Sequence, residues 1–314
     1  MQISYDNIPQ TGDEWESHCL ACYRCKYKNE HFTEIPAVHG GDAGIEAFTS
    51  TGVVCQCYCP ERDYDDEKHY AHLRDKMTKD ISKLTDLSYA KRLQSLGVPQ
   101  IREWHFMIPE YRDSRILEHA ESKRQEVLAL IASKPNEYGY ISPDFHIYIV
   151  NFEALKRWSI EAIRSNLLHT KLDLTTSNNE IHDWRECPSD KIENIRRKVQ
   201  AVKPTASTEN VEETVHHFAT AYLEGLQLIE RIRVGYPDLY EELYSLQQSY
   251  TRIVKSKSLM LGDSSMNSSH FQGILDDFGH QLEKQFNVIT PDTIAMLQND
   301  LVSGWLADCS LSFA

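Results

Sequence analysis

The stretch HGGDAGIEAFTSTGVVCQCYCPE, residues 39–61, decides how the N-terminal part of the chain is interpreted. Its glycines mark turns, and residues 44–48 and 53–57 have the β-branched and aromatic composition of short strands. Because side chains alternate between the faces of a strand, Gln56 and Tyr58 are expected on one face. The opposite face then carries three cysteines: Cys55, Cys57 and Cys59. The stretch predicts a β-hairpin whose two faces differ in chemistry.

The elements around this hairpin predict an α/β domain over residues 1–155. Apolar spacings of three and four residues indicate helices, and short apolar runs bounded by glycine or proline indicate buried strands. The predicted order is helix 14–28, strands 33–38, 44–48 and 53–57, helix 70–96, strand 101–109, helix 113–133 and strand 145–152. Such an order is typical of a mixed sheet flanked by helices.

Residues 156–314 predict an all-α domain. Its apolar stripes favour helices over residues 154–168, 211–233, 240–261 and 273–286. The helix at 211–233 is expected to start from a cap at Ser207 or Thr208, and a last helix from the Thr290 cap with Pro291 at its first position.

Composition limits the classes of function. The chain has 314 residues, 41% of them hydrophobic, and a formal net charge of −14. Such an acidic surface repels a phosphate backbone, so nucleic-acid binding would need a local basic face or a basic partner. No apolar run approaches the ~20 residues of a membrane span and no signal peptide is recognised, so we expect a cytoplasmic protein without a membrane partner.

The hairpin face with Gln56 predicts a metal site. In this arrangement Gln56 can meet Glu46 and the turn residue Asp42, which brings two carboxylates and an amide oxygen together. Hard oxygen ligands of this kind suit Mg²⁺ or Mn²⁺. The plainer interpretation is a turn acid and an edge-strand acid that both face water. The element order together with Gln56 favours the metal site.

The pattern GGDAGIEAF, a short turn and then VVCQCY resembles the active-site hairpin of the restriction-endonuclease-like superfamily, summarised as PD-(D/E)-x-K. It is similar to the variants that read G-D-x-G-I-D/E followed by Q-x-K, and the resemblance covers roughly the first 150 residues. It implies that Glu46 is the metal-binding acid, Asp42 a second acid, Gln56 a substitute for the second carboxylate and Glu16 of the first helix an outer ligand. The implied cofactor is Mg²⁺ or Mn²⁺.

Tyr58 stands where this family has a lysine. A lysine orients the attacking water and stabilises developing negative charge, whereas a phenol with a pKa near ~10 is a weaker replacement. The resemblance therefore implies Tyr58 near the attacking water. Lys68 and Lys76 of the following helix are the candidates for a lysine that reaches the site from elsewhere.

The segment QCYCPE resembles a Q-x-Y-x-P-E ending found in nuclease-like proteins of bacterial anti-phage systems, often encoded beside an ATPase. The resemblance implies a metal-dependent DNA endonuclease that acts as the effector of a defence complex. No G-x-x-x-x-G-K-[S/T] loop is present, so the ATPase would be a separate chain. The alternative is a degenerate nuclease fold that serves as a binding or assembly subunit. The helical half then suits docking to a partner, with a homo-oligomer as a further option.

The eight cysteines suggest a third hypothesis, an iron–sulfur or zinc protein. The triplet Cys19, Cys22 and Cys25 has a ferredoxin-like spacing. On a straight helix, however, these three residues spread over ~120° of arc, where a cluster needs a loop around it. Buried cysteines that act as small hydrophobic residues are the favoured interpretation. His105, inside a predicted strand, is similarly expected to be a satisfied core or face residue.

Overall fold

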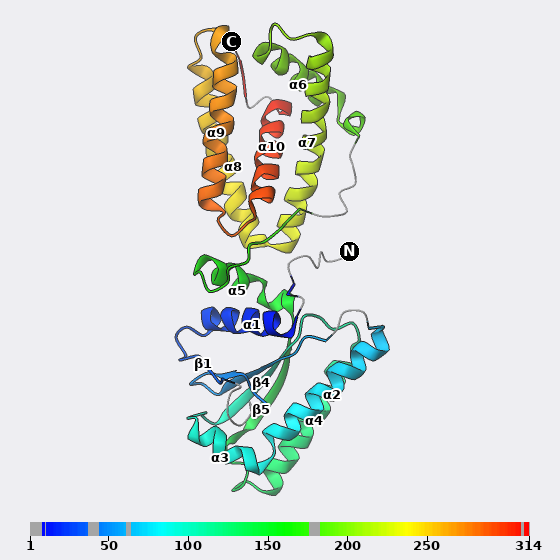
Figure 1. Ribbon diagram of the computed structural model, residues 1–314, viewed down its shortest axis with the longest axis vertical. Helices are drawn as coiled ribbons and strands as arrows, with labels where there is room; N and C mark the ends of the chain where they lie inside the picture. Colours follow the sequence, from blue (N-terminus) through cyan, green and yellow to red (C-terminus); the bar gives the residue numbers. More distant parts are fainter. Residues whose placement is uncertain are drawn as a thin grey trace. The chain divides into compact units, whose positions relative to one another are not determined.

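The computed structural model describes residues 8–9, 11–36, 44–60, 64–175, 183–308 and 311–313. The described residues form two compact units, one ending at His169 and the other beginning at Thr170 (Figure 1). Residues 156–169, which the sequence analysis placed in the helical domain, therefore belong to the first unit.

The first unit contains a five-stranded mixed sheet in the order β1-β2-β3-β4-β5. The strands are β1 (Thr33–Glu34), β2 (Ala47–Phe48), β3 (Val53–Cys57), β4 (Ile101–Met107) and β5 (Ile141–Val150). Strands β1, β2 and β3 pair antiparallel, whereas β4 lies parallel to β3 and β5 parallel to β4. The mixed α/β class predicted from the sequence is confirmed, although β1 and β2 are shorter than predicted. Pro36, which has no N–H to donate, follows β1 closely.

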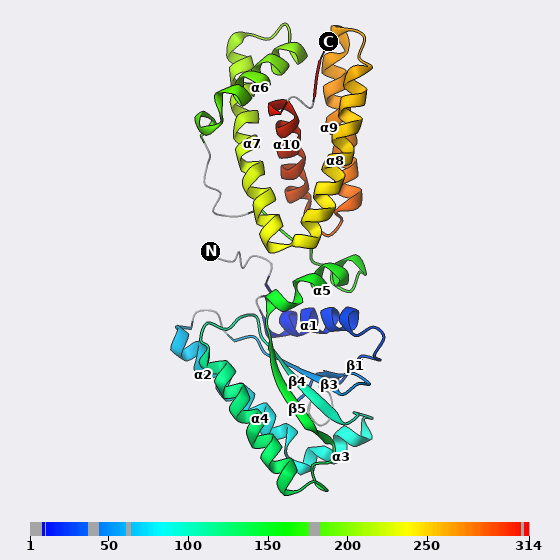
Figure 2. The same ribbon diagram turned by 180° about the vertical axis from the view of Figure 1, so that it is seen from behind.

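Helices cover both faces of this sheet (Figures 1 and 2). One face packs against α1 (Gly12–Lys26) and the start of α5 (Phe152–Arg164), and the other packs against α2 (Asp66–Leu84), α3 (Leu87–Ser95) and α4 (Arg115–Ser133). Each interface has its own apolar core. The unit is therefore a helix–sheet–helix sandwich in which β3 contributes to both cores.

Two helix boundaries differ from the sequence predictions because side chains cap the backbone there. Helix α1 begins at Gly12, and its N-cap is Thr11, which forms a capping box with Glu14. The predicted helix 70–96 is interrupted after Leu84. Asp86 accepts a hydrogen bond from the backbone N–H of Ser88 there and so starts α3 as a separate helix.

The second unit is helical. Its helices are α6 (Ser189–Val202), α7 (Thr208–Gly235), α8 (Pro237–Leu259), α9 (Asn267–Gln285) and α10 (Pro291–Ala307), with short 3₁₀ turns at Trp184–Glu186 and Ser264–Met266. Both views show α10 between α7 and α9 (Figures 1 and 2). The caps predicted at Ser207 and Thr290 are confirmed, whereas α6 was not predicted. In the described part of the chain, no helix is both long and apolar enough to cross a membrane.

Candidate metal site on the hairpin

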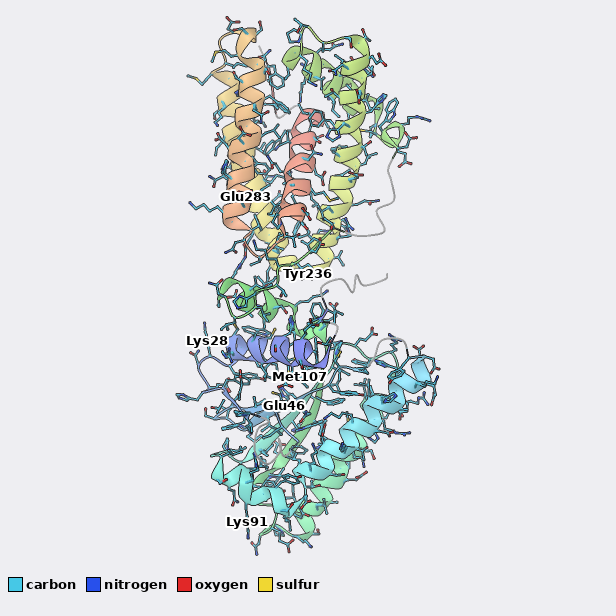
Figure 3. The ribbon with its side chains drawn as sticks, in the orientation of Figure 1. Lys28, Glu46, Lys91, Met107, Tyr236 and Glu283 are labelled. Atoms are coloured by element: carbon cyan, nitrogen blue, oxygen red, sulfur yellow. The ribbon has the colours of Figure 1, made fainter. Side chains whose placement is uncertain are left out.

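The hairpin brings Glu46 and Gln56 into contact. Ala47 pairs with Cys55 across β2 and β3, so the preceding Glu46 lies opposite Gln56. The Gln56 Nε2 group donates a hydrogen bond to Glu46 Oε1 at 2.5 Å and another to the Cys57 carbonyl at 3.3 Å. Figure 3 shows Glu46 in the layer of the sheet. Only 9% of Glu46 and 1% of Gln56 is exposed, so this polar pair is buried.

The other amide atom of Gln56 lacks a partner. Among the described residues, no group forms a hydrogen bond with the buried Oε1 oxygen of Gln56. Leaving such an acceptor unsatisfied costs about 1–3 kcal/mol. The Glu46 carboxylate accepts from the nitrogen of the same amide, and carboxylate and amide oxygens are both hard donors of the kind that Mg²⁺ and Mn²⁺ prefer. The residues present therefore fit a divalent cation.

The structure gives less information on the other two predicted ligands, Asp42 and Glu16. Asp42 lies outside the described residues. Glu16 is half-buried on α1. The pKa of Cys57 is raised by its hydrogen bond with Cys19 and by burial, and the charges of Glu46 and Glu16 add to the shift. Glu46 lies opposite Gln56 on the hairpin, whereas Glu16 belongs to α1, which covers the cysteine-bearing face of the sheet. The described residues contain no group of three or more His, Cys, Asp or Glu that could hold a metal.

Lys76, and not Lys68, lies near Tyr58. The Tyr58 ring stacks on Phe106 with 6.3 Å between centroids, and the Lys76 ammonium lies 5.9 Å from the Tyr58 ring centroid. Lys68 is at the start of α2, where its side chain is 70% exposed and pairs with Asp65 at 3.3 Å. Lys76 of α2 therefore reaches Tyr58.

Asp80 is a buried acid on α2 that the sequence analysis missed, and its backbone lies against Gly44 before β2. The Asp80 side chain is fully buried, with its carboxylate 2.7 Å from the Lys76 ammonium and 3.5 Å from that of Lys83. Gly44 has a φ of +80°, and a Cβ there would lie 2.6 Å from the Asp80 carbonyl oxygen. The sequence signal for the two ion pairs of Asp80 was the Lys-x-x-x-Asp-x-x-Lys spacing of residues 76–83.

The opposite face of the hairpin holds the cysteines, as predicted from strand alternation. Cys19 and Cys22 of α1 are fully buried in one apolar core with Cys55 and Cys57. Burial raises the pKa of Cys19 to about 11 and that of Cys22 to about 12. Neutral thiols of this kind pack as small hydrophobic residues, as expected. Cys309 lies outside the described residues.

His105 is a core residue with both ring nitrogens bonded. Nδ1 lies 2.7 Å from the Tyr23 hydroxyl, and Nε2 lies 2.8 Å from a carboxylate oxygen of Glu103. Desolvation lowers the pKa of His105 although the Glu103 carboxylate opposes the shift. Tyr23 is only 1% exposed and His105 only 4%, so the His105 ring and its tyrosine partner are buried. The predicted structural role of His105 is confirmed.

No family model, curated protein or solved structure matches the chain. Function is therefore argued from its own residues. The hairpin contact offers a carboxylate, an unsatisfied amide oxygen and, through Tyr58, a lysine from α2. Carboxylate and amide oxygens can contribute to the binding of a divalent metal, and a lysine can balance charge on a phosphate.

Proposed function

We propose that the chain is a metal-dependent nuclease subunit that hydrolyses phosphodiester bonds in DNA. The observation that carries the proposal is the buried Glu46–Gln56 contact with its unsatisfied amide oxygen. In this proposal the fold is restriction-endonuclease-like, and the chain acts as the effector of a bacterial anti-phage complex beside a separate ATPase.

The arrangement of elements supports the proposed fold. An acid-bearing helix, a hairpin, a long helix and a further strand follow each other along the chain, which is the order that the resemblance implies. The hairpin belongs to a mixed sheet flanked by helices. A sheet of this kind holds both hairpin strands rigidly, so the two ligand side chains keep their relative positions.

Each residue has a definite task in the proposed chemistry. Glu46 and Gln56 would hold Mg²⁺ or Mn²⁺, with Asp42 as a further ligand and Glu16 in an outer position. A bound metal lowers the pKa of a water molecule and shields the phosphodiester. The Gln56 amide N–H fixes the Glu46 carboxylate through its hydrogen bond.

Lys76 supplies the positive charge that Tyr58 lacks. Its ammonium lies over the Tyr58 ring and is held by the Asp80 carboxylate at 2.7 Å. A cation fixed in this way stabilises negative charge that develops on phosphate oxygens during hydrolysis. Tyr58 lies near the attacking water in this proposal. The exposed Lys79 on the same helix offers a contact to the DNA backbone, which a chain of net charge −14 needs locally.

One observation favours the second candidate function, a degenerate nuclease fold that serves as a binding or assembly subunit. The Tyr58 ring packs against Phe106 of the apolar core, as a structural residue does. This alternative keeps the fold and removes the reaction.

Cleavage of supercoiled plasmid distinguishes the two functions. The purified chain, alone and with the ATPase encoded beside it, is incubated with Mg²⁺, Mn²⁺ or EDTA. We expect metal-dependent cutting that the Glu46→Ala, Gln56→Ala double variant loses. Lys76→Ala should lower the cleavage rate by about 10²-fold or more, because a positioned cation contributes about this much.

Lys79→Ala is the matched control, since Lys79 is an exposed lysine on the same helix. It should change the rate by no more than about threefold at moderate salt, the effect of one phosphate contact. If folded protein that still binds the ATPase cuts nothing in any mixture, the nuclease proposal fails and the assembly role stands.

A further inference from the structure

The helical unit contains a cavity of about 600 Å³ between α6, α7, α9 and α10. Its apolar lining residues are Val199, Val202, Phe218, Phe271 and Leu306. Cavities of this size commonly bind small organic molecules, and an apolar wall with a few placed polar groups is their usual construction.

A buried lysine supplies one charge of this cavity. Lys198 lines it although only 2% of the residue is exposed. Its ammonium donates hydrogen bonds to the carbonyl oxygens of Trp305 at 2.9 Å and Leu306 at 2.5 Å, at the end of α10. These bonds hold the Lys198 ammonium against the end of α10, so Lys198 contributes a fixed positive charge to the surroundings of the cavity. Lysine is among the residues least often buried in this way.

A second lysine is held at the rim. The Thr214 hydroxyl donates to the Asn210 carbonyl at 2.8 Å and accepts a hydrogen bond from the Lys203 ammonium at 3.1 Å. His217 follows Thr214 on the same face of α7 and also lines the cavity. The lining therefore contains two lysines and one acid, Glu213, in a chain of net charge −14. This local reversal of charge favours an anionic ligand.

Aromatic rings and amides complete the lining. Phe218 and Phe271 meet edge to face with 6.0 Å between ring centroids. The amide side chains of Asn210 and Gln272 line the same cavity. Flat aromatic ligands pack well against such rings, and amides offer both donors and acceptors to the edge of a heterocyclic base.

We propose that this cavity binds a nucleoside monophosphate. The base lies against Phe218 and Phe271, and the phosphate lies toward Lys203 and His217. An inorganic anion would leave the apolar wall unused, and a neutral apolar molecule would leave Lys203 unused. The site is independent of the hairpin site and of the proposed nuclease activity.

Isothermal titration calorimetry of the full chain tests the proposal directly. The probes are AMP, GMP, CMP and UMP, with the four corresponding nucleosides and inorganic phosphate as the separate halves of each ligand. We expect at least one nucleotide to bind at least about tenfold more tightly than either half, because each half makes only part of the contacts. If no nucleotide binds at millimolar concentration, or if phosphate alone binds as tightly, the proposal is wrong.

Two charge-reversal variants distinguish a local contact with the phosphate from an effect of the overall charge of the protein. Lys203→Glu should weaken nucleotide binding by at least about tenfold, since it replaces a phosphate contact with a repulsion. Lys284→Glu makes the same change at an exposed position of α9 outside the lining, and should leave binding within about twofold. Equal weakening by both variants would overturn the assignment. Melting curves of the two variants verify that both are folded.

Discussion

Asp300 should make the unfolding free energy of the helical unit depend on pH, and one substitution should remove this dependence. Asp300 lies on α10 against α7, so close that a Cβ added at Gly225 would be 2.6 Å from the Asp300 Cβ. Only 4% of the residue is exposed, and within the described residues its Oδ2 atom has no hydrogen-bond partner. Burial raises the pKa of the Asp300 carboxyl from 3.8 to about 8, and the Glu224 charge adds to the shift, whereas Arg231 opposes it.

The sign of the effect follows from the two protonation states. A carboxyl with a raised pKa in the folded unit stabilises the fold fully below its unfolded pKa and loses this contribution as the pH rises through its folded pKa. Between these values the free energy of unfolding falls by about 1.4 kcal/mol for each pH unit. From roughly pH 5 to pH 8 the loss from Asp300 is on the order of 3 kcal/mol.

Urea unfolding of the wild type and of Asp300→Asn at both pH values measures this contribution. Asparagine has nearly the same shape and no proton to lose. We compare the unfolding free energy of the helical unit in the variant with that in the wild type at each pH. From the acidic to the alkaline condition, this difference should shift in favour of the variant by on the order of 3 kcal/mol. Asp292→Asn, at an exposed position of the same helix, is the control for the loss of one carboxylate from α10. A wild type and Asp300→Asn variant with the same pH dependence would refute the reasoning.

Three further predictions concern folding and thiol chemistry. Gly44→Ala should destabilise the first unit by about 2 kcal/mol or more in urea unfolding, because it adds a clash at 2.6 Å to a φ of +80°. Gly97 is the control, since it has a φ of +76° but no atom within 4 Å of an added Cβ, and Gly97→Ala should therefore cost only about 1 kcal/mol. Equal costs for the two substitutions would contradict the contact of Gly44 with α2. Lys198→Met should lower the unfolding free energy of the helical unit by about 2–3 kcal/mol, since it leaves two α10 carbonyls without their donor, and an unchanged urea midpoint would be inconsistent with this. In native protein at mildly alkaline pH, iodoacetamide followed by peptide mass spectrometry should label Cys25 well before Cys57, because Cys57 is buried and its pKa is raised well above the ordinary value.

Local sequence signals were sufficient for the hairpin faces and for several caps. Strand alternation placed Gln56 opposite the cysteines, and a threonine followed by proline marked the start of α10. Such features depend on neighbouring residues alone. The break between α2 and α3 was missed because apolar periodicity continues across Asp86, which caps a new helix through its side chain.

Contacts between distant elements could not be predicted in this way. The sequence offered Lys68 and Lys76 equally, and only the packing of α2 on the sheet brings Lys76 to Tyr58. The sequence analysis assigned no role to Asp80, yet Gly44 packs directly over its backbone. Helix α6 was missed because its charged residues suggest a solvated segment, whereas Lys198 is buried in the helical unit.

Binding of Mn²⁺ tests the central proposal most directly, since it requires neither the right substrate nor an activating partner. Electron paramagnetic resonance of free Mn²⁺, in titrations of the wild type, Glu46→Ala, Gln56→Ala and Lys79→Ala, reports occupancy of the site. We expect a specific Mn²⁺ site in the wild type and in Lys79→Ala. Removing the carboxylate of Glu46 should abolish this site, and removing the amide oxygen of Gln56 should weaken it. A Glu46→Ala protein that binds Mn²⁺ as tightly as the wild type would contradict the assignment of the hairpin as the metal site.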